Sequence, residues 1–327
     1  MTNTSIGLEI TSLCVRMAEV QLGKDGMTLQ GMAEEPLPAG AVVAGEVRDP
    51  EAVTHTVHTL WNRTGVRGKK VVLGVAGSRV AIRNTTLPWM PEGDISSALS
   101  LYVGDVLPFD SAEAVMDFVI DGETTDDEGN RLYTGILVAA ALDFIEPMVA
   151  AVEAAKLTVV GVDLTAFAIL RSSVAHYPWS PGATEVLVNV ASQMTQVIVH
   201  SNSRPQLVRG LVVGSDSAIE QYARLDPTSP TAGAEALEPL VDEIVTTIEY
   251  FKASNQGRPL ARLVLTGEGS QLPGIEYAIG SQLQIPIVRE AAWLGMPRAK
   301  LSVSDEQLHV MANSMGGAVG LAMGVAA

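Results

Sequence analysis

The sequence predicts an α/β protein of two related domains, with a small α+β subdomain inserted into the first. Three observations support this prediction. The chain has 327 residues, which is too long for one small core. Residues 5–33 and 185–213 follow the same plan of three short strands joined by tight turns. Between them, residues 78–162 alternate strands and helices that can close a core of their own.

The two three-stranded segments indicate an internal duplication. The first has strands at 5–10, 14–20 and 27–33, and the second has strands at 185–190, 195–200 and 206–213. Aligned without gaps, Glu9 corresponds to Asn189, Arg16 to Gln196 and the turn residue Ser12 to Ser192. We therefore expect two sheets, each beginning with an antiparallel meander.

The remaining elements follow from hydrophobic periodicity. Between the meanders we expect helices at 49–62, 91–106 and 143–155, and strands at 70–76, 80–87, 114–121, 131–141 and 157–162. After the second meander come a Pro/Ser/Thr-rich linker at 225–235, a helix at 236–253, a helix that begins at 272 or 274 and ends at 283, and a helix at 309–323. Strands are expected at 262–265 and 285–288. The last helix carries Gly316, Gly320 and Gly324 on one face, which indicates close packing against a neighbouring element within the chain.

Composition excludes several classes of function. Asp and Glu number 37 against 21 Lys and Arg, so general binding to nucleic acid is disfavoured. The single cysteine, Cys14, excludes an intrachain disulfide and is expected to be a small buried residue in a reducing cytoplasm. We expect no direct membrane insertion, because no apolar run is long enough and the tail GLAMGVAA lacks basic residues. No metal site is expected from the scattered histidines at 55, 58, 176, 200 and 309.

Three loops could hold phosphates. The turns at Thr11-Ser12 and Ala191-Ser192 direct backbone N–H groups outward, and two such turns facing each other could clamp an anion. The loop Gly267–Ser270 follows a buried strand and precedes a helix, where backbone N–H groups favour an anion or a nucleotide. Two turns and one strand–loop–helix are the arrangement of an actin-type nucleotide cleft.

The chain also resembles the type IV pilus assembly protein PilM family, which is related to the cell-division protein FtsA and to DnaK-type chaperones. The resemblance covers nearly the whole chain. It rests on GLEITSLCVRMAEV, on LPWMPEGDISSALSLYVGDVLPFD followed by an Asp-Phe strand, on VVGVDLTAFAILR and on LVLTGEGSQLPGI. The LPWMP and LPFD motifs and their spacing are the most specific, and they favour this family over FtsA.

The resemblance implies an actin-like, ribonuclease H-like duplicated fold. Subdomain 1A would comprise residues 1–77, 163–183 and 300–327. Residues 78–162 would form the inserted subdomain 1C, and residues 184–299 would form the second domain.

The resemblance also implies a nucleotide cleft, from which this sequence departs. If ATP and Mg²⁺ bind, the residues involved would be Glu9, Thr11, Ser12, Arg16, Asn189, Ala191, Ser192, Gly267, Gly269 and Ser270. The family has glycine where this chain has Thr11 and Ala191, and an acidic residue where it has Asn189. An amide supports Mg²⁺ and its waters less well than a carboxylate does. No catalytic residue can be named, and we expect weak or absent ATP binding without useful hydrolysis.

The resemblance further implies a partner, the short N-terminal cytoplasmic tail of the membrane protein PilN. The tail would occupy a groove between 1A and 1C, at the inner face of the cytoplasmic membrane, and a pilus motor ATPase would be a second partner. The residues expected at the groove are Val75, Ala76, Val80, Ile82, Arg83, Leu107, Pro108 and Phe109, and these could equally be ordinary core of 1C.

Two alternatives stay open. One is an active actin-like ATPase whose nucleotide state gates binding of the tail. The other is an FtsA-like protein that forms filaments.

Overall fold

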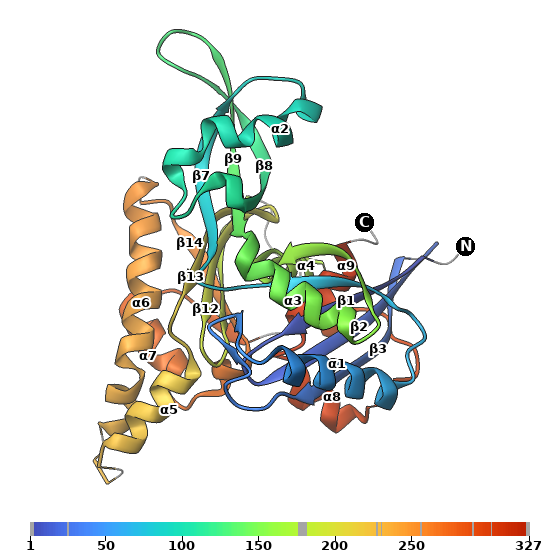
Figure 1. Ribbon diagram of the computed structural model, residues 1–327. Coiled ribbons are helices and arrows are strands. Elements are labelled where there is room, and N and C mark those ends of the chain that lie inside the picture. Colours follow the sequence, from blue (N-terminus) through green and yellow to red (C-terminus); the bar gives the residue numbers. More distant parts are fainter. Residues whose placement is uncertain are drawn as a thin grey trace.

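The computed structural model describes residues 3–24, 26–175, 182–226, 228–229, 231–255, 257–289, 291–301 and 303–324 (Figure 1). His176, parts of the predicted linker and the last residues of the GLAMGVAA tail lie outside these ranges. The described residues form two five-stranded sheets, a separate three-stranded sheet and the helices that cover them.

The sheet of the first domain has the order β10-β6-β1-β2-β3. Its strands are β1 (Asn3–Ile10), β2 (Cys14–Gly23), β3 (Gly26–Pro36), β6 (Lys70–Val75) and β10 (Thr158–Leu164). Helices α1 (Pro50–Thr64) and α3 (Leu142–Ala154) share one apolar core with this sheet, while α9 (Gly316–Gly324) packs on its other face. A short hairpin, β4 (Val42–Val43) and β5 (Glu46–Val47), precedes α1.

The sheet of the second domain has the corresponding order β13-β12-β11-β14-β15. Its strands are β11 (Thr184–Val190), β12 (Thr195–Ser201), β13 (Arg204–Leu211), β14 (Leu260–Thr266) and β15 (Ile287–Arg289). Helices α5 (Ser215–Arg224), α6 (Ala232–Ser254) and α7 (Ile275–Leu283) accompany it, and α6 and α7 supply much of its core. Helix α4 (Thr165–Val174) packs against the opposite face and so lies between the two sheets.

The predicted duplication is confirmed by topology and register. In each sheet an antiparallel meander is extended by two parallel strands. Glu9 pairs with Arg16 across β1 and β2, and Asn189 pairs with Gln196 across β11 and β12. The gapless alignment of the two meanders therefore identifies equivalent positions in the two domains.

The inserted subdomain projects from the first domain as a lobe (Figure 1). Its sheet has the order β7-β9-β8, with β7 at Val80–Pro88, β8 at Ala114–Thr125 and β9 at Arg131–Ala141. Helix α2 (Glu92–Tyr102) covers one face and closes a small core with it. The last helix and strand assigned to this subdomain from the sequence, α3 and β10, pack with the first domain because their apolar side chains complete its larger core.

Two predicted helices are shorter than expected. The helix expected over residues 91–106 ends at Tyr102, and residues 104–106 form a 3₁₀ turn. The helix expected over residues 309–323 is two helices, α8 (Asp305–Met311) and α9. Between these two, the carbonyl of Asn313 accepts hydrogen bonds from the backbone N–H of Gly267 and the hydroxyl of Thr266. The break in the helix thus ties the C-terminal segment to the second domain.

The glycines of α9 allow two elements to approach closely, as predicted. A Cβ on Gly320 would lie 1.7 Å from the carbonyl oxygen of Ala168 in α4. On the other side, a Cβ on Gly7 in β1 would lie 2.1 Å from the carbonyl oxygen of Ala318. Helix α9 is therefore held between β1 and α4 at backbone contact distance.

We predict that Gly320→Ala lowers the free energy of unfolding by about 3 kcal/mol, because the methyl group would meet backbone atoms that cannot rotate away. The control is Gly93→Ala in α2, where a Cβ would meet no atom within 4 Å. That variant should change stability by less than about 1 kcal/mol. Urea unfolding measures both, and equal stability of the two variants would contradict the packing described.

Candidate functional site

The two duplicated turns have the same backbone geometry and face each other across the interdomain cleft. The N–H of Thr11 donates to the carbonyl of Cys14 at 2.9 Å, and the N–H of Ala191 donates to the carbonyl of Met194 at 2.9 Å. Neither Thr11 nor Ala191, both described by the structure, has the positive φ that would favour glycine. Replacement of the family's glycines therefore does not strain the backbone here, and its effect is to add side-chain atoms to the cleft.

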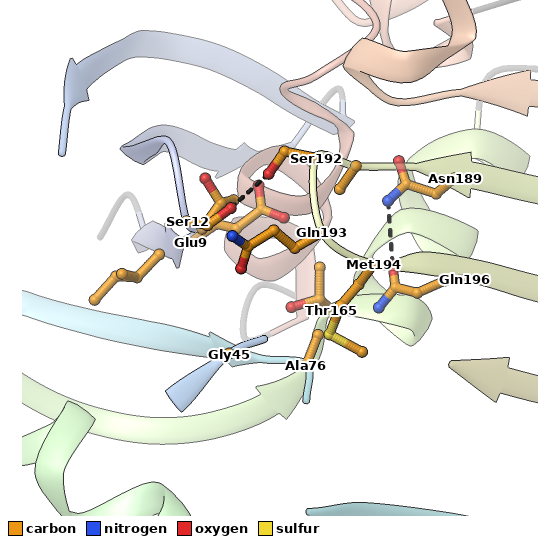
Figure 2. A pocket seen from close by; sticks show the side chains of 13 residues that line it. Glu9, Ser12, Gly45, Ala76, Thr165, Asn189, Ser192, Gln193, Met194 and Gln196 are labelled. Carbon is orange, nitrogen blue, oxygen red and sulfur yellow. Dashed lines mark hydrogen bonds between the residues drawn. The ribbon is translucent and has the colours of Figure 1, made fainter. Parts of the chain in front are cut away.

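The turns are in direct contact. The hydroxyl oxygens of Ser12 and Ser192 lie 2.5 Å apart, and Figure 2 shows them meeting from opposite sides. Beside them, the side-chain oxygen of Gln193 accepts a hydrogen bond from the N–H of Ala44 at 2.9 Å. Both contacts join the first domain to the second.

Little space remains between the turns. The cavity there has a volume of about 60 Å³. Pockets for small molecules and cofactors are roughly 300–1,000 Å³. Of the predicted nucleotide residues, six line this cavity: Glu9, Thr11, Ser12, Asn189, Ala191 and Ser192. A cavity of this volume has room for a few water molecules but not for a nucleotide.

A carboxylate of the protein uses the donors that an anion would need. Oε1 of Glu268 accepts from the backbone N–H of Ser192 at 3.1 Å, and Oε2 accepts from Nη2 of Arg16 at 3.4 Å. Arg16 is buried and also lies 3.3 Å from a carboxylate oxygen of Glu34 and 4.0 Å from one of Glu9. We call these four side chains, Arg16, Glu9, Glu34 and Glu268, the Arg16 cluster.

Glu268 and Gln193 were missed at the level of sequence. The loop TGEGS was considered for its glycines and serine as an anion site, although it carries an acidic side chain itself. The negative charge of Glu268 would repel an anion, and this could have indicated that the loop is not an anion site. The importance of Gln193 depends on a contact with Ala44, 149 positions away in the sequence, which no local pattern reveals.

The third loop packs against the second turn instead of opening toward the cleft. Gly267 has a φ of 86°, and a Cβ there would lie 2.3 Å from the carbonyl oxygen of Val190. A Cβ on Gly269 would lie 2.4 Å from the side chain of Val190, and the hydroxyl of Ser270 donates to the carbonyl of Gly267. The glycines of this loop thus serve close packing between β11 and the turn that follows β14.

The N-terminus of α5 is also occupied. The N–H groups of Ser215 and Asp216 donate to the carbonyls of Ala191 and Ser192, each at 2.9 Å. These donors would otherwise be available to an anion in the cleft.

No side chain named from the sequence as a possible support for hydrolysis lies as a free carboxylate in the cleft. Asn189 donates to the side-chain oxygen of Gln196 at 3.2 Å (Figure 2). The second domain thus has an amide pair where the first has Glu9 and Arg16. Glu220 and Glu235 are exposed and bonded on their own helices, to Arg224 and Thr231 respectively. Burial raises the pKa of the Cys14 thiol to about 11, so it stays protonated at neutral pH.

Glu9 is the most unusual ionisable group of the cleft. Its carboxylate faces the beginning of α9, where a Cβ on Gly317 would lie 2.5 Å from it. Its Oε2 accepts no hydrogen bond from the described residues. Burial raises the pKa of Glu9 to about 7, an effect that Arg16 and the N–H of Ala318 oppose and that Glu268 reinforces.

The predicted partner-binding residues form two groups: those from Val75 to Arg83 border two cavities, and those at 107–109 line neither of the two. Val75, Ala76, Val80 and Ile82 line one small cavity of about 30 Å³ beneath the lobe, together with residues of α4 and β13. Ile82 and Arg83 also border a larger hollow of about 470 Å³ between β7, β13 and α6. Leu107 packs against the core of the lobe, Phe109 packs against the core of the first domain, and Pro108 is exposed.

Among the described residues, no group of three or more His, Cys, Asp or Glu side chains is arranged to hold a metal ion. Within the same ranges, no helix has both the length and the apolar character that a bilayer crossing requires.

We predict that protonation of Glu9 makes the free energy of unfolding depend on pH. Between about pH 4.5 and pH 7 the folded protein holds the proton of Glu9 more tightly than the unfolded chain does, so the free energy of unfolding falls as the pH rises. Glu9→Gln lacks this titration. Its stability relative to wild type should therefore rise across this window, by on the order of 3 kcal/mol, and level off above it.

Urea unfolding at a series of pH values measures this difference. Glu238→Gln, which removes an exposed carboxylate of α6, is the control and should follow the wild-type curve. If the curve for Glu9→Gln also ran parallel to that of wild type, the altered pKa of Glu9 would be wrong.

Comparison with known proteins agrees with this architecture. The chain is similar to the solved structure described as a PilM-PilN type IV pilus biogenesis complex, with a TM-score of 0.83 and 22% identity over 98% of this chain and 97% of that one. It is also similar to ethanolamine utilization protein EutJ from Carboxydothermus hydrogenoformans, with a TM-score of 0.53 and 10% identity over 97% and 89%. The fold is the actin-like ATPase fold that the sequence predicted.

The family model described as type IV pilus assembly protein PilM matches residues 7–225, which is more than half of the chain. This match and the duplicated fold agree with the resemblance noted from the LPWMP and LPFD motifs. The chain belongs to the type IV pilus assembly protein PilM family.

Proposed function

We propose that this protein is a cytoplasmic scaffold of the type IV pilus machine that binds the N-terminal cytoplasmic tail of a PilN-like inner-membrane protein. Family membership and the similar solved complex, whose description pairs PilM with PilN, support the partner. The observation that carries the choice of a binding module over an ATPase is the contact between Ser12 and Ser192, which leaves a cavity of only about 60 Å³.

Three features support a degenerate nucleotide cleft. The turns that would clamp phosphates are bonded to each other, and the N–H of Ser192 is taken by Glu268. An incoming phosphate would meet the carboxylates of Glu268 and Glu34, and the partly protonated Glu9, around a single Arg16. The position equivalent to Glu9 is Asn189, so the second domain supplies no carboxylate there for Mg²⁺. These residues do not fit ATP and Mg²⁺ in the closed arrangement.

The tail is proposed to bind where the lobe joins the body of the protein. The chain leaves β6 of subdomain 1A at Val75 and Ala76 and enters β7, where Val80, Ile82 and Arg83 would form one wall of the groove. The hollow of about 470 Å³ beside Ile82 and Arg83 lies between the lobe and β13 and α6 of the second domain, and not between the lobe and subdomain 1A as the resemblance implied. It can receive several side chains of an extended peptide. Leu107, Pro108 and Phe109 would form the opposite end of the groove. Binding there would recruit the protein to the inner face of the cell membrane without inserting it.

We predict that Arg83→Glu weakens binding of a synthetic N-terminal tail peptide by at least about tenfold, because Arg83 is exposed at the wall of the groove. Ile82→Asp, which places a charge on the apolar wall, should do the same. The peptide is taken from the product of a neighbouring PilN-like gene. Arg67→Glu is the charge-matched control, on an exposed loop outside the lobe, and should bind as wild type does.

Fluorescence polarisation of the labelled peptide gives the three affinities. A further expected result is that saturating MgATP leaves the wild-type affinity unchanged. Wild-type affinity in both groove variants would refute the groove, and a strong effect of MgATP would favour the alternative of an active, gating ATPase.

A further inference from the structure

The outer edge of the lobe offers a second binding surface, distinct from the groove at β7. In the sheet order β7-β9-β8, strand β7 lies on the side of α6 and β8 forms the opposite edge (Figure 1). Among the described residues, β8 pairs only with β9. An edge strand presents alternate backbone N–H and C=O groups to solvent, and these can pair with an added strand.

The hydrogen bonds identify which residues face outward. The N–H of Phe118 donates to the side-chain Oδ1 of Asp117 at 2.8 Å instead of to β9. Along an antiparallel strand, the backbone groups of alternate residues point toward the partner strand and away from it. The backbone N–H and C=O groups of Met116 and Ile120 therefore point to the same free edge as those of Phe118. A bulge follows Ile120, and the carbonyl of Asp121 already accepts from Arg204. The free edge therefore runs over residues 114–120, about the length of a typical strand.

The side chains along this edge are suited to a partner of definite chemistry. Val115 and Val119 are 53% and 39% exposed, with the exposed Asp117 between them on the same face. Residues 84–130 contain eleven Asp and Glu and not one Lys or Arg. Because successive side chains of a strand point to opposite faces, an extended segment with apolar residues at positions i and i+4 and a basic residue at i+2 would match both the valines and Asp117.

The same charges disfavour a second copy of this chain as the occupant. Antiparallel pairing of two β8 strands along this edge would place Asp117 of one copy opposite Asp117 of the other, and like charges across strands are destabilising. Charged residues on an edge commonly serve to prevent such self-association. Here they leave the edge available to a basic strand.

We propose that the free edge of β8, residues 114–120, binds an extended basic segment of a partner protein, which adds a fourth strand to the lobe. The segment places apolar side chains against Val115 and Val119 and a Lys or Arg against Asp117. Its incoming backbone replaces the local bond between Asp117 and the N–H of Phe118.

The test uses the full-length protein and a labelled synthetic peptide of ten residues, Val-Thr-Lys-Thr-Val-Thr-Lys-Thr-Val-Thr, in which valine and lysine alternate along one face of the extended strand. Two N-methylated versions of this peptide are compared, each blocking the N–H groups along one of its two edges. Strand addition predicts that the unmodified peptide binds, that one N-methylated version loses binding and that the other retains it. Equal affinity of both versions, or no binding by the unmodified peptide, would overturn the proposal.

Protein variants test the electrostatic part. Asp117→Lys should weaken binding of the alternating peptide by about tenfold or more. Asp127→Lys makes the same charge change on the exposed loop between β8 and β9 and should change affinity by less than about twofold. Equal loss in both variants would mean that the peptide responds only to overall charge, and would overturn the site. Arg83→Glu should not weaken this binding, so failure here is distinguishable from failure of the tail groove.

Discussion

The structure depends on one arrangement: the carboxylate of Glu268 lies between the backbone N–H of Ser192 and the guanidinium of Arg16. Together with the contact of Ser12 and Ser192, it joins the two duplicated turns at the place where an actin-like fold would hold phosphates. A buried arginine needs carboxylates around it, and removing one partner of such a group typically costs about 3–5 kcal/mol. The cleft is therefore closed by interactions internal to the chain, and they include the groups that a nucleotide would require.

The inserted lobe differs from the body of the protein in its surface. Residues 80–141 carry eleven Asp and Glu against two Lys and Arg, which accounts for nine of the chain's sixteen net negative charges. The lobe also has exposed apolar side chains at Trp89, Leu101 and Tyr102 as well as on β8. Charge of one sign with exposed apolar groups favours recognition of particular partners over general association. Two opposite edges of one small sheet then supply the two proposed binding surfaces.

Much of the fold could be predicted from local patterns. The two meanders repeat at an offset of 180 residues, and this spacing correctly predicts that Glu9 and Asn189 occupy equivalent positions. The glycines of α9 correctly predict its close packing. The break between α8 and α9 was not predictable, because it depends on hydrogen bonds that the carbonyl of Asn313 accepts from Gly267 and Thr266 in another domain. The role of Glu268 was missed for the same reason, since its partners lie 76 and 252 positions away.

The most direct test of the closed cleft is a crystal structure of the protein grown with a saturating, non-hydrolysable MgATP analogue. We expect the hydroxyls of Ser12 and Ser192 to stay within hydrogen-bonding distance, Glu268 to keep the N–H of Ser192, and no nucleotide to lie between the turns. Phosphates bound between the two serines, with Glu268 displaced from Arg16, would contradict the account.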